Sequence, residues 1–191
     1  MCGGAQNVLN TSARAGRRAM PKTNPVVEDL MRIRRELTAL NNMKIHVGIQ
    51  GDANSDLLMI AAVHEYGCTI KVTPKMRGYF RYNFGVNLKA STGYINIPER
   101  SFIRASYDSG KQGIDGVIRM AVGRVVKDRW TAKQAAENIG LFCVQMTQDF
   151  INSGQVTPPK SQFTQERSSQ YTPLFDSGRL VGSITYKIEG G

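Results

Sequence analysis

The stretch 131–150, TAKQAAENIGLFCVQMTQDF, carries the clearest helical pattern in the chain. Thr131 and Gln134 stand three residues apart, which is the spacing of a capping box at the start of a helix. Behind this start, apolar residues recur every three or four positions and predict one buried helical face. They are Ala132, Ala135, Ala136, Ile139, Cys143, Met146 and Phe150. We therefore expect a long amphipathic helix that ends near 152–154.

A second apolar stripe of helical spacing precedes this stretch. Its members are Ile114, Val117, Ile118, Ala121, Val122 and Val125. Residues 101–108 predict a short separate helix, because Pro98 ends the segment before them. Gly110 and Gly113 predict a loop between that short helix and the stripe.

The N-terminal half alternates helical and extended patterns. Asn24 and Pro25 form a helix start, with Asn as the cap and Pro at the first helical position. The helix is expected to run to about Leu40, followed by a strand at 44–50. A helix from Asp56 is expected to end at Gly67, and a short strand follows at 69–72.

The segment 78–97 predicts a β-hairpin with its turn at 91–93. Aromatic and basic residues alternate along its first strand and would lie on opposite faces. Phe80, Tyr82 and Phe84 fall on one face, and Arg77, Tyr79 and Arg81 on the other. Such a face can stack nucleic-acid bases while the arginines hold phosphates, or the rings can simply belong to the core.

The C-terminal part begins with a long polar surface loop at about 155–173, followed by a helical turn near 179–181 and a strand at 184–188. The whole order predicts an α+β fold, in which a largely antiparallel β-sheet packs against several α-helices. We expect one such domain over 24–191. A loop of that length is commonly functional or disordered.

Composition places a flexible basic arm at 1–23, in front of the domain. The chain has 191 residues, 25 Lys and Arg against 15 Asp and Glu, and a net charge of +10. The arm carries only basic charges, on Arg14, Arg17, Arg18 and Lys22. It would attract nucleic acid or an acidic protein partner, or remain a solvated tail. The apolar runs are too short for a membrane span, so no membrane partner is expected.

The catalytic inventory predicts a protein that is not an enzyme and needs no metal or cofactor. There are three widely spaced cysteines, with no metal-ligand or disulfide pattern. His46 and His64 are the only histidines, and neither lies in a motif of nucleophilic or metal-assisted catalysis. The carboxylates stand singly, without a pair suited to acid–base work.

Three segments together resemble one family. They are 63–67 (VHEYG), 97–104 (IPERSFIR) and 173–186, which holds PLFDSGRL and SITY, while 72–77 resembles a longer variant. Their order and spacing resemble the neck and tail-completion proteins of tailed bacteriophages, described as head–tail joining, tail-terminator or virion morphogenesis proteins. The resemblance covers about 43–189 and does not include the arm.

The resemblance implies a structural protein made in the cytoplasm of a bacterial host and located in the neck or tail of the virion. It implies a homo-oligomeric ring, often a hexamer, with head-connector or adaptor proteins and the tail tube protein as partners. DNA would pass through its channel. Tail terminator, head-side adaptor and minor tail protein remain open as alternatives, as does a nucleic-acid-binding module that uses the basic arm and the aromatic strand.

The motif residues divide into expected core and expected interface. Phe102, Leu174 and Leu180 are expected to hold the fold together. Arg100 and Arg104 are expected to form ion pairs between subunits or with a partner. The other candidate interface residues are basic: Arg14, Arg17, Arg18, Lys22, Arg77, Arg81, Lys160 and Arg167.

Overall fold

The computed structural model describes residues 24–51, 55–166, 173–174 and 178–190. The helices are α1 (Pro25–Asn42), α2 (Ser55–Tyr66), α3 (Pro74–Phe84), α4 (Phe102–Lys127), α5 (Ala132–Asn152), α6 (Gln162–Gln165) and α7 (Arg179–Gly182). The strands are β1 (Lys44–Ile49), β2 (Cys68–Lys71), β3 (Tyr94–Ile97) and β4 (Ile184–Glu189). The predicted α+β class is confirmed. The arm at 1–23 lies outside the described residues.

The strands form two separate antiparallel ladders. In the first, β1 pairs with β4, so that Lys44 lies opposite Glu189 and Ile49 opposite Ile184. In the second, β2 pairs with β3. The antiparallel direction is as predicted, and the strands are divided between two small sheets.

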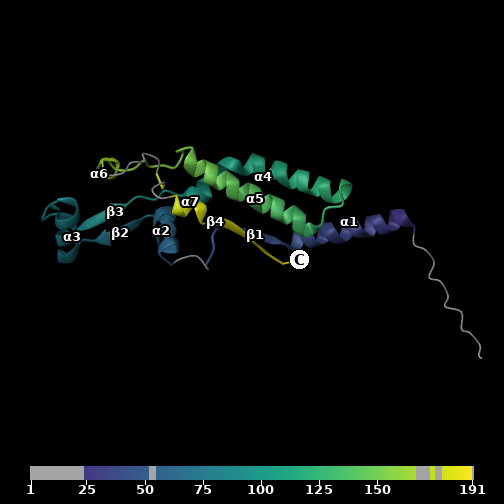
Figure 1. Ribbon diagram of the computed structural model, residues 1–191, viewed down its shortest axis with the longest axis horizontal. Coiled ribbons are helices and arrows are strands. Elements are labelled where there is room, and N and C mark those ends of the chain that lie inside the picture. The colour runs from purple at the N-terminus through teal and green to yellow at the C-terminus, as the bar shows by residue number, and fades with distance from the viewer. Residues whose placement is uncertain (1–23, 52–54, 167–172, 175–177, 191) are drawn as a thin grey trace, which may run out of the picture.

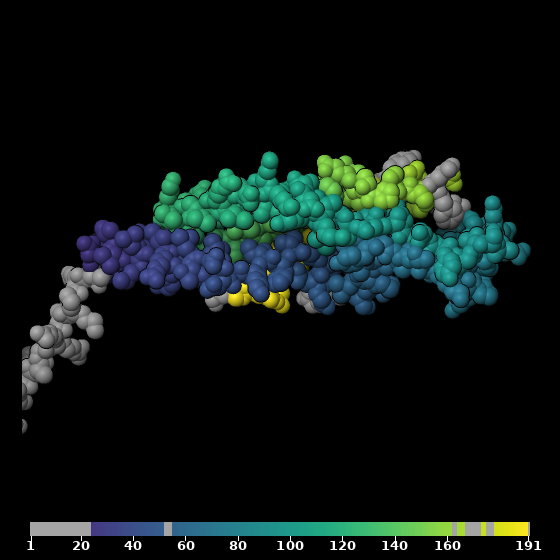
Figure 2. All heavy atoms as spheres, turned by 180° about the vertical axis from the view of Figure 1, so that it is seen from behind, coloured from purple at the N-terminus to yellow at the C-terminus, as the bar shows by residue number. Residues whose placement is uncertain are grey.

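The described part of the molecule is elongated (Figure 1). The helix α5 packs against the β1–β4 ladder in the middle, and α4 lies antiparallel to α5 on its other side. The helix α1 lies at one end, and α3 with the β2–β3 ladder lies at the other. The surface seen from behind has the same long outline, with α1 and α3 at its two tips (Figure 2).

The helix α4 is continuous, so the predicted loop at Gly110 and Gly113 is wrong. Both glycines face side chains of α5. A Cβ on Gly113 would stand 3.0 Å from Cζ of Phe142, and one on Gly110 would collide with Met146. The glycines are therefore helix-packing residues, which cost helix propensity but allow the two helices to approach.

The predicted hairpin at 78–97 is also wrong in its first strand, because 74–84 forms α3 and only 94–97 is extended. Thr73 caps α3, with Oγ1 accepting from the backbone N–H of Met76 at 3.2 Å. Pro74 occupies the first turn, and Gly85 ends the helix at φ +66°. These start and stop signals outweigh the strand propensity of the aromatic residues between them.

Other local predictions are confirmed. Asn24 caps α1, and Thr131 with Gln134 forms the capping box of α5. Gly67 follows α2 at φ +72°. The expected polar loop is partly regular, because it contains α6 and buries Val156.

The core consists of two clusters. The first gathers around Phe102 and contains Ala61, Phe102, Ile151, Val156, Leu180, Val181 and Ile184. The second lies between α1, α4 and α5, and contains Ala121, Val125, Ala135 and Ile139. Cys143 packs against the second cluster, and burial raises the pKa of its thiol.

Candidate functional site: the motif junction and its groove

The first two motif segments meet where α2 ends and α4 begins. The carbonyl of His64 accepts a hydrogen bond from the backbone N–H of Arg100 at 2.7 Å. A Cβ on Gly67 would stand 3.0 Å from the backbone nitrogen of Glu99, so only glycine fits there. This place, which we call the motif junction (63–67 with 97–104), joins segments more than 30 residues apart.

Glu65 is the polar centre of the motif junction. Its side chain is buried, with 5% of the residue exposed. Its two carboxylate oxygens accept from the backbone N–H groups of Ile103 at 3.0 Å and Arg104 at 3.2 Å. A carboxylate from α2 thus satisfies the first N–H groups of α4, where the helix dipole also favours negative charge.

Arg104 binds this carboxylate from its solvent-facing side. Its guanidinium donates to the Glu65 carboxylate at 2.9 Å, to the Glu65 carbonyl at 2.6 Å and to Glu99 at 2.8 Å. It also lies 5.0 Å from the centre of the Tyr66 ring. The bond with Glu65 raises the pKa of Arg104. These contacts lie within the chain, so an ion pair of Arg104 with another subunit remains a prediction.

The third motif segment packs on the same place. Phe102 is completely buried, and Leu180 and Ile184 belong to its cluster. Leu174 packs against that cluster from the side, with its backbone at φ +64°. The core role expected for Phe102, Leu174 and Leu180 is confirmed. Positions 175–177 of this segment lie outside the described residues.

Arg100 connects the motif junction to the loop after α5. It is a buried cation, 9% exposed, and burial lowers the pKa of its guanidinium. Its Nε donates to the carbonyl of Pro158 at 2.7 Å, and a terminal nitrogen donates to the carbonyl of Pro159 at 2.9 Å. Arg100 therefore fixes the loop to α4, and its expected contact with a partner stays a prediction.

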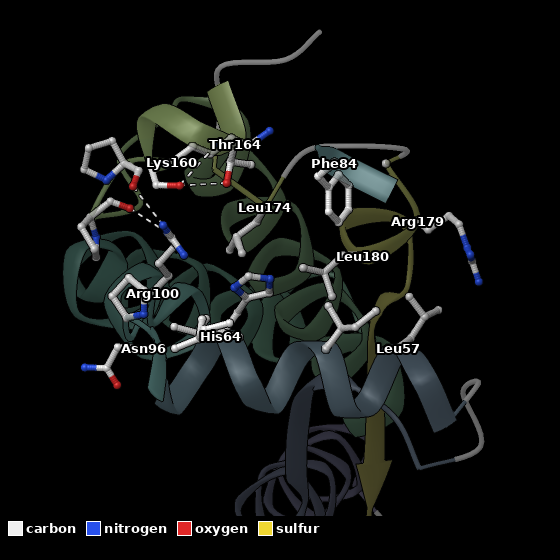
Figure 3. A pocket seen from close by; sticks show the side chains of 18 of the residues that line it. Leu57, His64, Phe84, Asn96, Arg100, Lys160, Thr164, Leu174, Arg179 and Leu180 are labelled. Carbon is white, nitrogen blue, oxygen red and sulfur yellow. Dashed lines mark hydrogen bonds between the residues drawn. The ribbon is translucent and has the colours of Figure 1, made fainter. Parts of the chain in front are cut away.

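A groove of about 950 Å³ opens beside the motif junction. Its described walls come from α2, α3, β3, the segment 158–161 with Thr164, and Leu174 with the start of α7. Figure 3 shows Leu57, Leu174 and Leu180 pointing into it and Arg179 pointing outward at its rim. Three cations line the groove, namely Arg100, Lys160 and Arg179, and its described lining residues include no acid.

His64 lies in the wall of this groove. Burial, and secondly the charge of Arg100, lower the pKa of its imidazole. Its Nδ1 is buried without a hydrogen-bond partner among the described residues. A neutral imidazole fits a wall that already contains a buried cation.

The remaining predicted interface residues have different positions. Arg77 lies on α3 and holds the loop between α3 and β3 in place. It donates to the carbonyls of Leu88, Lys89, Ala90 and Thr92. Arg81 is exposed on the same helix, and Lys160 lines the groove. Five others lie outside the described residues: Arg14, Arg17, Arg18, Lys22 and Arg167.

The described residues offer little for catalysis. His46 is exposed on β1 and lies 3.3 Å from Glu189, far in the fold from the groove. Over the parts of the chain that the structure describes, no group of three or more His, Cys, Asp or Glu side chains is placed to hold a metal ion. Nor is any described helix long and apolar enough to cross a bilayer.

Exposed apolar surface is the feature that the sequence analysis missed. Among the described residues, 17 large hydrophobic side chains are exposed, whereas 13 hydrophobic residues are buried and five of those are alanines. The helices α1 and α3, at the two ends, bury no residue at all. The missed signal was the run of apolar residues in the first two turns of α1, at Val26, Val27, Leu30 and Met31.

Comparisons with protein-family models, with curated proteins and with solved structures find no match to this chain.

Proposed function

We propose that the chain is a structural subunit of a tailed-phage virion, which associates into a ring at the neck or tail end. The ring would complete the tail, meet the head connector or its adaptor, and leave a channel for DNA. The proposal combines the motif resemblance with the physical character of the surface.

The exposed apolar surface carries this proposal. Single exposed apolar side chains are ordinary in soluble proteins, whereas apolar side chains that gather into a patch mark an interaction site. Here seven of the 17 exposed side chains lie at the tips of a long molecule, four on α1 and three on α3, and the others are spread over α2, α4, α5, β2 and β3. Such surface becomes buried when the chain associates with other copies or with a partner, and a ring requires association between copies.

The contacts of the motif residues favour a structural role over a catalytic one. Glu65 caps a helix, Arg104 holds Glu65, and Arg100 holds a loop. A catalytic acid or base needs to face substrate, whereas these groups use their hydrogen bonds within the fold. The motif junction is therefore a device that sets the direction of α4 relative to α2.

The alternative, a nucleic-acid-binding module, loses one of its two supports. The aromatic residues at 79–84 lie on a helix, so they do not form the flat strand face on which bases would stack. The net charge of +10 is its other support.

Negative-stain electron microscopy of the purified full chain, with duplex DNA binding measured at several salt concentrations, tests the proposal. We expect closed rings with a central opening and weak DNA binding. A monomer whose DNA affinity falls steeply with salt would overturn the proposal in favour of the nucleic-acid module.

A further inference from the structure

The first two turns of α1 carry an apolar face that is exposed among the described residues. Val26 and Leu30 are 64% and 60% exposed, and Val27 and Met31 are exposed beside them. Both pairs are spaced i and i+4, so the four side chains share one side of the helix. Leu37, farther along α1, packs against the core cluster. The helix thus has one anchored half and one uncovered half.

The uncovered half lies at one tip of the molecule, beyond the ends of α4 and α5 (Figure 1). The direction of this half of α1 is fixed by two ion pairs of Asp29, one with Arg32 and one with Arg129, both at 3.0 Å. Arg32 also donates to the carbonyl of Val125 at 3.1 Å. An apolar helix end held out from the body in this way is preorganised for docking.

The groove lies toward the opposite tip, between α2, α3 and the loop after α5. Its walls are mainly apolar, and Leu57, Ile60 and Leu180 are among them. The charged side chains among its described lining residues are all positive. An occupant that matches it is a short apolar helix with acidic residues.

We propose that the first two turns of α1 of one copy dock into the groove of the next copy. The segment 25–31 is apolar, contains Glu28 and Asp29, and has no basic residue. Glu28 is exposed on the docking half and complements the cations of the groove. Side chains at i, i+3 or i+4 and i+7 anchor an amphipathic helix in an apolar groove, and Val26 with Leu30 supply the first of these anchors. The inference rests on the proposed function in one respect, that copies of the chain associate.

The contact is heterologous, because each copy offers a helix at one tip and a groove near the other. Such contacts close into rings when the rotation between copies closes and otherwise give open filaments. The helix and the groove would join neighbouring copies, while the copy number depends on the rotation between them.

Two variants block the two halves of the contact separately. The helix variant carries Val26→Gln and Leu30→Gln, and the groove variant carries Ile60→Asp and Arg179→Glu. All four side chains are exposed, so the fold tolerates the changes. Matched controls change exposed neighbours: Thr38→Gln on α1, and Met59→Asp on α2 beside Ile60 but outside the groove.

Light scattering of the full chain measures the outcome. We expect the wild type and both controls to form the same oligomer, and each blocked variant alone to be monomeric at the same concentration. Loss of two side chains that the contact would bury corresponds to at least about a tenfold weaker affinity between copies. A mixture of the two blocked variants retains one intact contact, between the wild-type helix of the groove variant and the wild-type groove of the helix variant. It is expected to form dimers that grow no further.

Three results would overturn the inference. Oligomers that persist in both blocked variants would show that other surfaces join the copies, and the proposed ring would survive. A wild type that stays monomeric at every soluble concentration, or a mixture that gives no dimer, would exclude the contact. Wild-type filaments lost in both variants would support the contact and contradict the ring.

Discussion

The middle of the molecule and its two tips differ in how their side chains are packed. In the middle, α4 and α5 approach each other at glycines, Phe102 is completely buried, and polar groups such as Glu65 have several partners. At the tips, α1 and α3 bury no residue and expose large apolar side chains. The motif junction belongs to the middle, so the family resemblance rests on residues that build the fold. The surfaces that serve association lie outside those motifs.

The largest effect is expected from truncation in the middle. Phe102→Ala removes a fully buried ring and should lower the free energy of unfolding by about 3–5 kcal/mol. Tyr82→Ala, at a tip, removes a ring that is 91% exposed and should leave stability unchanged. Urea denaturation measures both, and Phe102→Leu provides a milder change if the alanine variant does not fold. Equal losses at both positions would abolish the contrast between middle and tips.

Removing the Glu65 carboxylate should lower the free energy of unfolding more than removing the neighbouring Arg104–Glu99 ion pair. Glu65→Ala leaves the N–H groups of Ile103 and Arg104 without their acceptor in a buried place and should cost about 1–3 kcal/mol. Glu99→Ala removes only an exposed partner of Arg104 and should change stability little. Chemical denaturation of the two variants side by side decides this. A loss for Glu99→Ala as large as that for Glu65→Ala would contradict the capping role.

Two glycine substitutions separate packing from helix propensity. A Cβ on Gly140 of α5 would stand 2.6 Å from the Tyr186 ring, so Gly140→Ala should destabilise the fold by about 1–3 kcal/mol. At Gly116 of α4 nothing lies within 4 Å of a Cβ, so Gly116→Ala should stabilise by about 0.5–1 kcal/mol. The midpoint of thermal unfolding, measured for both variants, shows whether each substitution stabilises or destabilises the fold. Stabilisation at Gly140 would mean that β4 does not pack against α5 as described.

The pH dependence of His64 gives the smallest effect. Burial lowers the pKa of folded His64 below the ordinary 6.5, and the charge of Arg100 lowers it further. In acid the unfolded chain therefore takes up this proton before the folded chain does. The stability that neutral His64 provides is complete above about pH 6.5, falls as the pH decreases below that value, and is fully lost below the folded pKa.

The measurement compares urea denaturation of the wild type and His64→Gln between about pH 7 and pH 5. The wild type should lose stability more steeply than the variant as the pH falls. Thr38→Gln is the control, because Thr38 is exposed on α1 and carries no titratable group, and this variant should follow the wild type. Parallel curves for the wild type and His64→Gln would contradict the burial of a neutral imidazole.

Sequence reasoning succeeded where local chemistry decides the structure. The caps at Asn24 and Thr131 and the stop at Gly67 were predicted because each signal acts within a few residues. Gly110 was misread as a loop because its reason, the approach of α5, lies far along the chain. The strand predicted at 78–84 failed because aromatic alternation was weighed above the Thr73–Pro74 start and the Gly85 stop.

The candidate site was predictable in part. The motifs marked the residues of the junction, and Phe102 and Leu180 were expected in the core, where they lie. The partners of Arg100, two proline carbonyls of a distant loop, carry no sequence signal. The groove depends on how α2, α3 and that loop are placed in three dimensions, which periodicity does not encode.

Hydrogen–deuterium exchange of the full chain at low and high protein concentration tests most directly whether the tips are completed by other copies. The account predicts that backbone amides in the first two turns of α1, and in α2 and α3 around the groove, become protected as concentration rises, while α4 and α5 remain equally protected throughout. Protection that is independent of concentration at both tips would contradict it.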